Sequence, residues 1–383
     1  MRKKRDGNVR NVWLLGGSSF FNDVGAEMIT PLLPFYITAL GGGGIAIGLI
    51  SGLREGLASI FKIFGGWISD RTGKRKEFIF LGYLLSTIFK FFIALASSWQ
   101  YVIAFVSLER FGKFRDAPRD AMISYSKKVT GRNFGIVQML DVIGGIIGTI
   151  IVLFLFWKFN FEIKGIILIA AGISVFSLLP LLFVHEHKIK ATKKNLYRSV
   201  EDLNSRLKYF IFVSSVFAFG NFGLYMFLIL TAQKATNSFV IPLVLYILFN
   251  ISYAIFLVPF GKLSDKIGRK KIIFLGYLLF LVLTLGLVFY SSIIHLAILF
   301  FIYGMVYAIT YSSQRALVGD LAKDTKGTAF GTFHTAIGLA GIPGGILAGF
   351  LWDINPRIMF MYLSFVAFVS IVLLCFVKDG WKR

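Results

Sequence analysis

The sequence predicts an all-α multi-pass membrane protein with about twelve transmembrane helices, arranged as two pseudo-symmetric six-helix bundles. Of its 383 residues, 56% are hydrophobic and the mean hydropathy is +0.75, so lipid is the solvent for much of the surface. Apolar stretches close to the ~20 residues that a spanning helix needs recur along the chain. A basic stretch that interrupts this pattern occurs twice, about half a chain apart.

The expected spans follow one another with short polar connections. We interpret the first as a retained span, because the apolar segment after the basic residues 1–5 is too long for a signal peptide and has no small-residue cleavage site. A polar, basic segment at 185–208 separates two groups of six spans. We therefore predict an N-terminal bundle at 1–184, a cytoplasmic basic linker at 185–208 and a C-terminal bundle at 209–383. The spans are expected near residues 12–40, 45–69, 78–97, 101–126, 134–156, 163–184, 209–231, 240–263, 272–290, 294–321, 327–351 and 358–377.

The formal net charge of +22 is concentrated in short loops between apolar spans. That placement favours membrane topology and contact with anionic headgroups over nucleic-acid binding. By the positive-inside rule, both termini and the linker are expected to be cytoplasmic, in a protein of the cell membrane. The single cysteine, Cys375, excludes an intrachain disulfide.

The repeated basic stretch occupies residues 66–76 and 261–271, and each copy is followed by the string Phe-Leu-Gly-Tyr-Leu-Leu. In both copies a glycine is followed four residues later by an aspartate near a helix end. A second glycine then permits a left-handed turn, and basic residues follow it. Ordinary basic turns also obey the positive-inside rule, but that rule requires neither the aspartate nor the glycines.

This stretch resembles the signature loop of the major facilitator superfamily, G-x-x-x-D-[RK]-x-G-[RK]-[RK]. The resemblance covers essentially the whole chain and implies two six-helix bundles with a substrate site between them near the membrane midplane. It also implies a conformational latch, in which Asp120 resembles the acid that joins Asp70 and Lys74. We see no evident acid matching Asp120 in the second half, so Asp265 is expected to matter less. The expected latch residues are Gly66, Asp70, Arg71, Gly73, Lys74, Asp120, Gly261, Asp265, Gly268 and Arg269.

Two further features are similar to the proton-coupled drug and solute exporters of that superfamily. In the first span an acid, Glu27, precedes Pro31, as in the first helix of drug exporters. The fifth span contains Gly144 and Gly148, which resemble the exporters' glycine signature without its proline. The closer match to that signature is the glycine-rich segment around Pro343 in the eleventh span.

Charged residues inside apolar spans are concentrated in the first half of the chain. A charge at the bilayer centre costs about 3 kcal/mol or more, so it needs a partner and usually has a function. Asp23 and Glu27 share a helix face, where repulsion and burial raise their proton affinity. We predict that Glu27 is the main proton carrier and that Asp23 supports it or contacts substrate. The alternative is a structural salt bridge to Arg54 or Lys62, and Lys90 receives no role from the sequence.

The fourth span is the most densely charged, between residues 109 and 120. Lipid does not tolerate such a face, so it must line water or protein. We predict that Arg115 and Arg119 pair with Asp116, Asp120 or Asp70.

In the second half, Tyr303, Tyr307 and Tyr311 recur at helical spacing. They would line a cavity for an aromatic or amphipathic substrate, unless they serve core packing. The expected substrate-binding residues are Asn22, Asp23, Arg54, Lys62, Arg115, Arg119, Asn221, Tyr225, Tyr307, Gln314 and Arg315.

The sequence contains no P-loop, no nucleophile constellation and no metal-ligand cluster, so we predict no enzyme activity, cofactor or bound metal. The predicted function is secondary active transport of a small organic solute by alternating access, with proton-coupled export. The expected partners are the lipid bilayer, a small-molecule substrate and protons, without nucleic acid, and the expected assembly is a monomer. The alternatives are an importer, a metal-ion exporter that uses Asp23 and Glu27 as ligands, or a non-transporting receptor or scaffold.

Overall fold

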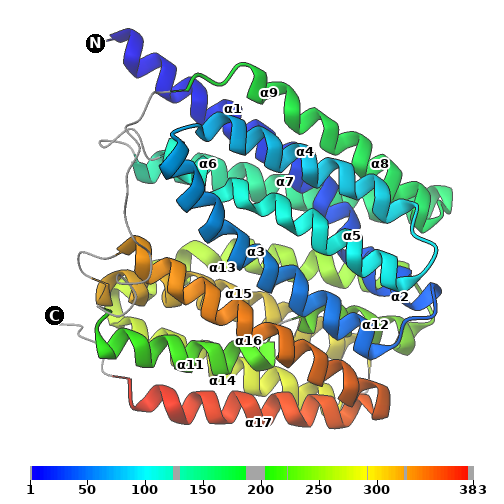
Figure 1. Cartoon of the computed structure of the whole chain (residues 1–383). Coiled ribbons are helices and arrows are strands. Elements are labelled where there is room, and N and C mark those ends of the chain that lie inside the picture. The colour runs from blue at the N-terminus through cyan, green and yellow to red at the C-terminus, as the bar shows by residue number, and fades with distance from the viewer. Residues whose placement is uncertain are drawn as a thin grey trace. The chain divides into compact units, whose positions relative to one another are not determined.

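The computed structural model describes residues 2–123, 130–186, 203–221, 223–290, 292–322 and 326–377. Within these ranges all regular secondary structure is helical, which confirms the predicted all-α class (Figure 1). Ten segments of this described part are long and apolar enough to cross a membrane. The first and fourth predicted spans are not among them, and both carry charged residues that lower their hydropathy.

The first predicted span is α1 (Arg2–Ile29), which continues through the short helix η1 (Thr30–Leu32) into α2 (Leu33–Ala39). Pro31 and Pro34 lie in the first turn of these short helices, where the missing N–H group of proline costs no hydrogen bond. The next five spans are α3 (Gly44–Thr72), α4 (Arg75–Ala94), α5 (Trp99–Phe111) with η2 (Gly112–Arg115) and α6 (Asp116–Ile123), α7 (Thr130–Phe159), and α8 (Ile163–Val175) with η3 (Phe176–Leu178) and α9 (Leu179–Leu182).

The second half repeats this order of long helices. Its seventh predicted span is divided between α11 (Ser205–Asn221) and α12 (Leu224–Thr236). The division lies at Gly223, whose φ of 79° is a conformation that glycine adopts without steric cost. The remaining spans are α13 (Val240–Ile267), α14 (Arg269–Val288), α15 (Ile293–Leu321), α16 (Lys326–Ile354) and α17 (Pro356–Cys375).

Both copies of the repeated basic stretch end a helix at a glycine with positive φ. Gly73 follows α3 with a φ of 71°, and Gly268 follows α13 with a φ of 105°. The N–H of Gly73 donates to the carbonyl of Ser69 at 2.9 Å, and that of Gly268 donates to Ser264 at 3.2 Å. The expected positive-φ turn is therefore present in both copies, and it satisfies a carbonyl in the last turn of each helix.

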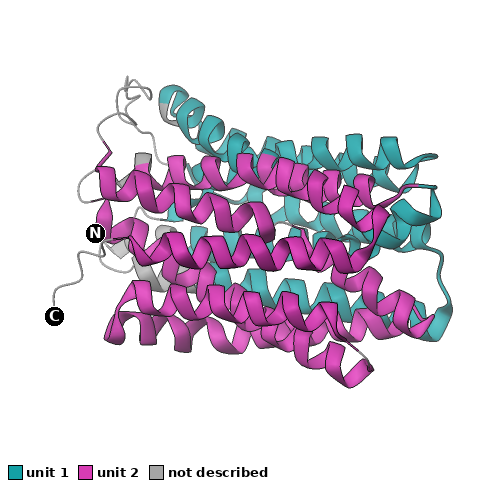
Figure 2. Cartoon of the chain, turned by 90° about the horizontal axis from the view of Figure 1, so that it is seen from below, with its two compact units in different colours: residues 1–41, 57–194 teal, residues 42–56, 195–383 magenta. Residues whose placement is uncertain are grey.

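The helices form two compact units, which Figure 2 shows in different colours. Unit 1 contains residues 1–41 and 57–194, and unit 2 contains residues 42–56 and 195–383. The continuous helix α3 therefore contributes its first half to unit 2 and its second half to unit 1. The predicted boundaries of the linker stay a prediction, because residues 187–202 lie outside the described part.

In unit 1, α1 packs along α7 through small residues. A Cβ atom on Gly144 would lie 2.7 Å from the carbonyl oxygen of Phe20, and one on Gly148 would overlap the carbonyl oxygen of Val24. Small residues let two helix backbones approach this closely. The close approach brings polar side chains of α1 next to those of α7.

In unit 2, the first half of α3 packs against α16 backbone to backbone. A Cβ atom on Gly48 would overlap the carbonyl oxygen of Gly345, and one on Gly52 would lie 2.9 Å from the carbonyl oxygen of Gly341. The carboxylate of Asp353 on α16 accepts hydrogen bonds from the N–H groups of Gly44 at 2.6 Å and Ile45 at 3.0 Å. Asp353 thus satisfies two of the N–H groups that a helix start leaves without partners.

Candidate functional site

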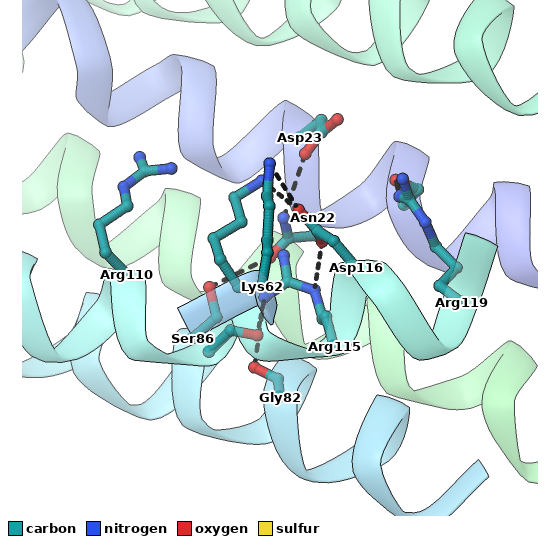
Figure 3. Close-up of polar contacts among 12 residues, drawn as sticks. Asn22, Asp23, Lys62, Gly82, Ser86, Arg110, Arg115, Asp116 and Arg119 are labelled. Carbon is teal, nitrogen blue, oxygen red and sulfur yellow. Dashed lines mark hydrogen bonds and ion pairs between the residues drawn. The ribbon is translucent and has the colours of Figure 1, made fainter. Parts of the chain in front are cut away.

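Unit 1 contains a group of ionisable and polar side chains between its helices, which we call the charged core; Figure 3 shows part of it. Its members come from α1, the second half of α3, α4, α5, η2, α6 and α7. They are Ser19, Asn22, Asp23, Glu27, Lys62, Ser86, Lys90, Glu109, Arg110, Lys113, Arg115, Asp116, Arg119, Asp120 and Asp141.

Lys90 is one of the most enclosed cations of the charged core, with 1% of its surface exposed. Its ammonium donates to the side-chain oxygen of Asn22 at 2.9 Å, to the backbone carbonyl of Asn22 at 3.2 Å and to the hydroxyl of Ser174 at 2.9 Å. These acceptors are neutral and come from α1 and α8, so the lysine connects α4 to two other helices. The sequence offered no partner for Lys90, since none of these residues is near it in the chain.

Glu109 provides the nearby negative charge. Its carboxylate accepts a hydrogen bond from Ser86 at 2.5 Å and lies 3.0 Å from the guanidinium Nε of Arg110. Ser86 also lies 3.3 Å from the Asn22 side-chain oxygen that Lys90 binds. Glu109 thus pairs with the adjacent residue of its own helix, Arg110.

Asp116 lies among three cations at the start of α6. Its carboxylate is 3.2 Å from Lys62, 3.9 Å from Arg115 and 4.0 Å from Lys113. Lys62 thus has an acidic partner that the sequence did not suggest, and its proposed pairing with Asp23 or Glu27 stays a prediction. Close packing of α3 on η2 brings Lys62 to this acid, since a Cβ atom on Gly65 would overlap the backbone of Phe114.

Arg115 is buried, with 1% of its surface exposed. Its guanidinium lies over the ring of Tyr83 at 4.1 Å and donates to the carbonyls of Gly82 at 3.3 Å and Gly112 at 2.9 Å. Figure 3 shows this side chain directed toward Gly82 of α4. These contacts join α4 to η2, so they describe a structural role for Arg115 beside its expected ion pair with Asp116.

Arg119 connects α6 to α1 and α7. Its guanidinium donates to Ser19 at 2.7 Å, pairs with Asp120 at 3.3 Å and lies 3.9 Å from Asp141. The predicted pairing of Arg119 with Asp120 is present. The contacts with Ser19 and Asp141 were not predicted, although Asp141 has the same signal as the other candidates, a charge within an apolar span.

Asp23 and Glu27 lie on the part of α1 that faces α7. Both side chains are half-buried. Asp23 accepts a hydrogen bond from Asn22 at 3.1 Å and repels the carboxylate of Asp141 electrostatically. A Cβ atom on Gly145 would lie 3.3 Å from the Cγ of Glu27, which places Glu27 directly against α7. The structure thus brings three acids to the seam between α1 and α7.

Unit 2 contains a connected row of aromatic rings, which we call the tyrosine ladder. Successive ring centroids lie 5.0 to 6.2 Å apart. The ladder comes from α12, α13 and α15 and includes the three tyrosines noted in the sequence. Its members are Tyr225, Tyr246, Phe249, Tyr253, Tyr303, Tyr307 and Tyr311.

An arginine lies at each end of the tyrosine ladder. Arg54, in the part of α3 that belongs to unit 2, donates to the hydroxyl of Tyr225 at 3.2 Å. Arg315 stacks on Tyr311, with its guanidinium carbon 3.5 Å from the ring centroid. The predicted binding residues Arg54, Tyr225, Tyr307 and Arg315 are therefore grouped along one row of contacts.

Two other predicted binding residues lie elsewhere in unit 2. Gln314 is buried and donates to the hydroxyl of Tyr277 at 2.9 Å, and Tyr277 stacks on Phe217 at 3.9 Å. These contacts occupy the Gln314 amide in packing between α14 and α15. Asn221 ends α11, and its side-chain oxygen is enclosed without a hydrogen-bond donor among the described residues.

The two signature turns differ in their ion pairs. In the second copy, Arg269 pairs with Asp265, lies 3.2 Å from Asp320 and donates to Ser264 at 2.7 Å. Asp320, at the end of α15, is an acid of the second half that contacts the signature turn and that the sequence did not single out.

In the first copy, Lys74 pairs with Glu77 at 3.1 Å, and both side chains are exposed. Arg71 lies over the ring of Trp67, 5.4 Å from its centroid. The side chain of Asp70 lies outside the described part, so its predicted pairing stays a prediction. The first glycine of each copy lies close to another helix. A Cβ atom on Gly66 would lie 3.1 Å from the Cβ of Ala117 in α6, and one on Gly261 would lie 3.9 Å from the Cβ of Ser312 in α15.

Comparison with known proteins identifies the family. The profile of the Major Facilitator Superfamily matches residues 15–245 and 209–380. The chain belongs to the major facilitator superfamily. A relative, the uncharacterized MFS-type transporter MJ1317 of Methanocaldococcus jannaschii, is 43% identical over 378 residues, which cover 96% of this chain and 95% of that protein. The multidrug resistance protein MdtH of Photorhabdus laumondii is 24% identical over 368 residues, with 91% of this chain and 89% of that protein covered.

Solved structures agree with this membership at the level of the fold. A crystal structure of the nucleoside transporter NupG has a TM-score of 0.82 at 16% identity and covers 95% of this chain and 99% of that one. A bacterial homolog of the human lysosomal transporter Spinster, in an inward-facing and occupied conformation, has a TM-score of 0.78 at 15% identity, with 97% and 98% covered. This superfamily member is thus a multi-pass membrane transporter and not an enzyme.

Lys90 should be essential to the stability of this transporter. Lys90→Met keeps the length of the side chain but leaves the oxygens of Asn22 and Ser174 without their donor. We expect a loss of about 2–4 kcal/mol of stability, because buried acceptors lose their partner and Glu109 loses a nearby cation. The measurement is the melting temperature of the purified protein in detergent. A Lys158→Met variant, changed near the exposed end of α7, serves as control, and equal melting of both variants would contradict this role.

The signature turn of the second half should respond to loss of its acid. Asp320→Asn removes one of the two carboxylates that hold Arg269, and we expect it to weaken the junction of α14 and α15 by about 1 kcal/mol, since the pair is partly exposed. Trypsin cleavage near residues 266–271 should then become faster. Glu77→Gln, which removes the exposed pair of the first copy, is the matched control. Cleavage at the parent rate in Asp320→Asn would show that Asp265 alone holds Arg269.

Proposed function

We propose that this protein is a secondary active transporter that exports a small organic solute across the cell membrane by alternating access, coupled to protons. The observation that carries the proposal is the charged core of unit 1. Charges inside a membrane protein are costly, and they persist where they bind substrate, ions or protons. A receptor or scaffold would gain nothing from acids and bases held at this depth.

The seam between α1 and α7 supports proton coupling. Asp23, Glu27 and Asp141 lie there, and Arg119 lies within ion-pair distance of Asp141. Like charges in a site of low dielectric favour protonation of one member, while a nearby cation opposes it. A change in water access or in the distance to Arg119 would shift this balance. Protonation is then linked to conformation, which is the physical requirement for coupled transport. We assign the main proton transfer to Glu27 and a supporting role to Asp23.

The proposed arrangement in the membrane follows from the sequence. The basic turns at 71–76 and 266–271, the linker and both termini lie in the cytoplasm by the positive-inside rule. The signature turns then act as latches on the cytoplasmic side, with Asp70 and Asp265 as their acids. The protein works as a monomer of two six-helix bundles, divided at residues 185–208.

Export is favoured over uptake by the names of two relatives. MdtH is a multidrug resistance protein, and PmrA of Streptococcus pneumoniae, which is 27% identical over 134 residues, is a multi-drug resistance efflux pump. The metal-ion alternative gains no support from the structure, since no group of three His, Cys, Asp or Glu side chains in the described part is placed to hold a metal ion.

The test uses purified protein in proteoliposomes. A solute is first selected by its ability to raise the melting temperature, because binding to the folded state stabilises it. Flux of the radiolabelled solute is then measured with an imposed pH gradient and without one. A proton antiporter accumulates solute in an acidic lumen, whereas a proton symporter accumulates it in an alkaline lumen. Accumulation in the alkaline lumen would overturn export, and equal flux under all conditions would overturn proton coupling.

A further inference from the structure

We propose that the solute is a planar aromatic anion, whose ring stacks on the tyrosine ladder and whose acidic group binds Arg315. This inference rests on the proposed function, because it names the substrate class of the transport site. It is carried by the position of the ladder on its helices, by the distribution of charge along it and by the geometry of the stacked arginine.

The ladder does not face lipid. On α13, between residues 244 and 258, the exposed large apolar side chains are Val244, Ile251, Ile255 and Val258, which recur at helical spacing and form one stripe. Tyr253 lies two positions from both Ile251 and Ile255, so it projects from the opposite side of the helix. Its neighbours in the ladder, Tyr307 and Tyr311, are only partly buried. Tyrosine faces are thus available on the side of α13 that is directed away from lipid.

The two ends of the ladder differ in charge. At the Arg54 end, the adjacent residue Glu55 carries a negative charge, and both residues interact electrostatically with Tyr307. The positive and negative charges there largely compensate each other. At the other end, no carboxylate among the described residues lies within ion-pair distance of Arg315. The net positive charge of the ladder is therefore localised at Arg315, which favours an anionic group at this end.

The stacking of Arg315 on Tyr311 prepares the guanidinium for an anion. The guanidinium carbon lies 3.5 Å from the centroid of the Tyr311 ring, and at this separation a parallel stack directs the N–H groups outward from the edges of the guanidinium plane. A guanidinium has five such donors in a fork that matches a carboxylate in two parallel hydrogen bonds. The stack also fixes the side chain before the ligand arrives, which reduces the entropy lost on binding.

The rings of the tyrosine ladder provide the contacts for the aromatic part of the ligand. Tyr253 and Tyr311 have their centroids 6.1 Å apart with planes inclined by 76°, and Tyr253 and Tyr307 are 6.2 Å apart at 86°. Rings arranged edge to face present both a π face and an edge to a neighbouring ligand, and aromatic ligands pack favourably against either. A planar ring held here lies within one helical turn of Arg315, since Tyr311 and Arg315 are successive positions on one face of α15.

The test measures binding of a matched set of probes to the full-length protein in lipid nanodiscs by titration calorimetry. The set is 2-naphthoate, neutral 2-naphthamide, cationic 2-naphthylmethylammonium and the saturated anion decahydronaphthalene-2-carboxylate. We expect saturable binding of 2-naphthoate, with each of the other three at least about 10-fold weaker, because each lacks either the charge or the flat ring. Equal or tighter binding of the amide or the cation would overturn the proposal.

Variants locate the site. Arg315→Gln should weaken 2-naphthoate by about 10- to 100-fold, since it removes a charged hydrogen-bond donor, and Tyr311→Leu should weaken it by about 3- to 10-fold. Arg315→Lys keeps the charge, and its affinity for 2-naphthoate should lie between those of the parent and of Arg315→Gln. An intermediate affinity separates loss of the site from loss of the fold. Arg357→Gln, an exposed arginine at the start of α17, is the control. Parent-like affinity in Arg315→Gln, or an equal loss in Arg357→Gln, would contradict the assignment.

The results also separate this inference from the proposed function. Specific binding of 2-naphthoate without any response of its flux to a pH gradient would retain the aromatic anion site and remove proton coupling. Proton-driven flux of another solute, with no binding of 2-naphthoate, would retain the transport function and overturn the substrate class.

Discussion

The Glu27→Gln variant is expected to bind solute like the parent but to transport it no faster with a pH gradient than without one. Glutamine is nearly isosteric with a protonated glutamate and cannot release a proton. The expected loss is complete, down to the flux of empty liposomes under gradient-driven conditions, while exchange of labelled for unlabelled solute continues. The reason is linkage: a site that stays neutral in both conformations cannot couple the proton gradient to their equilibrium.

Two comparisons make this result specific. Glu162→Gln, in the exposed connection before α8, removes an acid from the same unit and should leave gradient-driven flux unchanged. Asp141→Asn tests another acid on the seam between α1 and α7. If Glu27→Gln responds to the gradient like the parent and Asp141→Asn does not, the proton carrier is Asp141, and our assignment of Glu27 is wrong.

The sequence predicted those parts of the fold that have local signals. Apolar runs of span length became helices, and both glycines of the repeated turn adopt positive φ, because length, hydropathy and backbone freedom are properties of short segments. The pairing of Arg119 with Asp120 was predictable for the same reason, since the two residues are adjacent in the chain.

Contacts between distant segments were not predictable in this way. Lys90 binds Asn22 and Ser174, which are 68 and 84 residues away in the sequence, and no periodicity indicates that these positions meet. Likewise, no local feature of α3 shows that residues 42–56 belong with one unit and the residues after them with the other. Such partners depend on how whole helices pack, and small residues such as Gly148 set that packing.

The Gly48→Ala variant is expected to destabilise the protein, although the same exchange within a helix is normally favourable by about 0.5–1 kcal/mol. The added methyl group would overlap the carbonyl oxygen of Gly345 on α16, which is backbone and cannot turn aside like a side chain. The first half of α3 must then move away from α16. We expect a net cost of about 1–3 kcal/mol, the usual cost of overpacking, and a lower melting temperature.

Gly172→Ala provides the matched control, because no atom lies within 4 Å of a Cβ atom at this position in α8. Its melting temperature should equal or exceed that of the parent, so the two alanine variants should change stability in opposite directions.

Separation of α3 from α16 would also weaken the hydrogen bonds from Gly44 and Ile45 to Asp353. Asp353→Asn should therefore reduce the stability less in the Gly48→Ala background than in the parent, since the effects of substitutions within one contact network are not additive. Additive losses would show that the glycine contact and the Asp353 cap hold α3 independently.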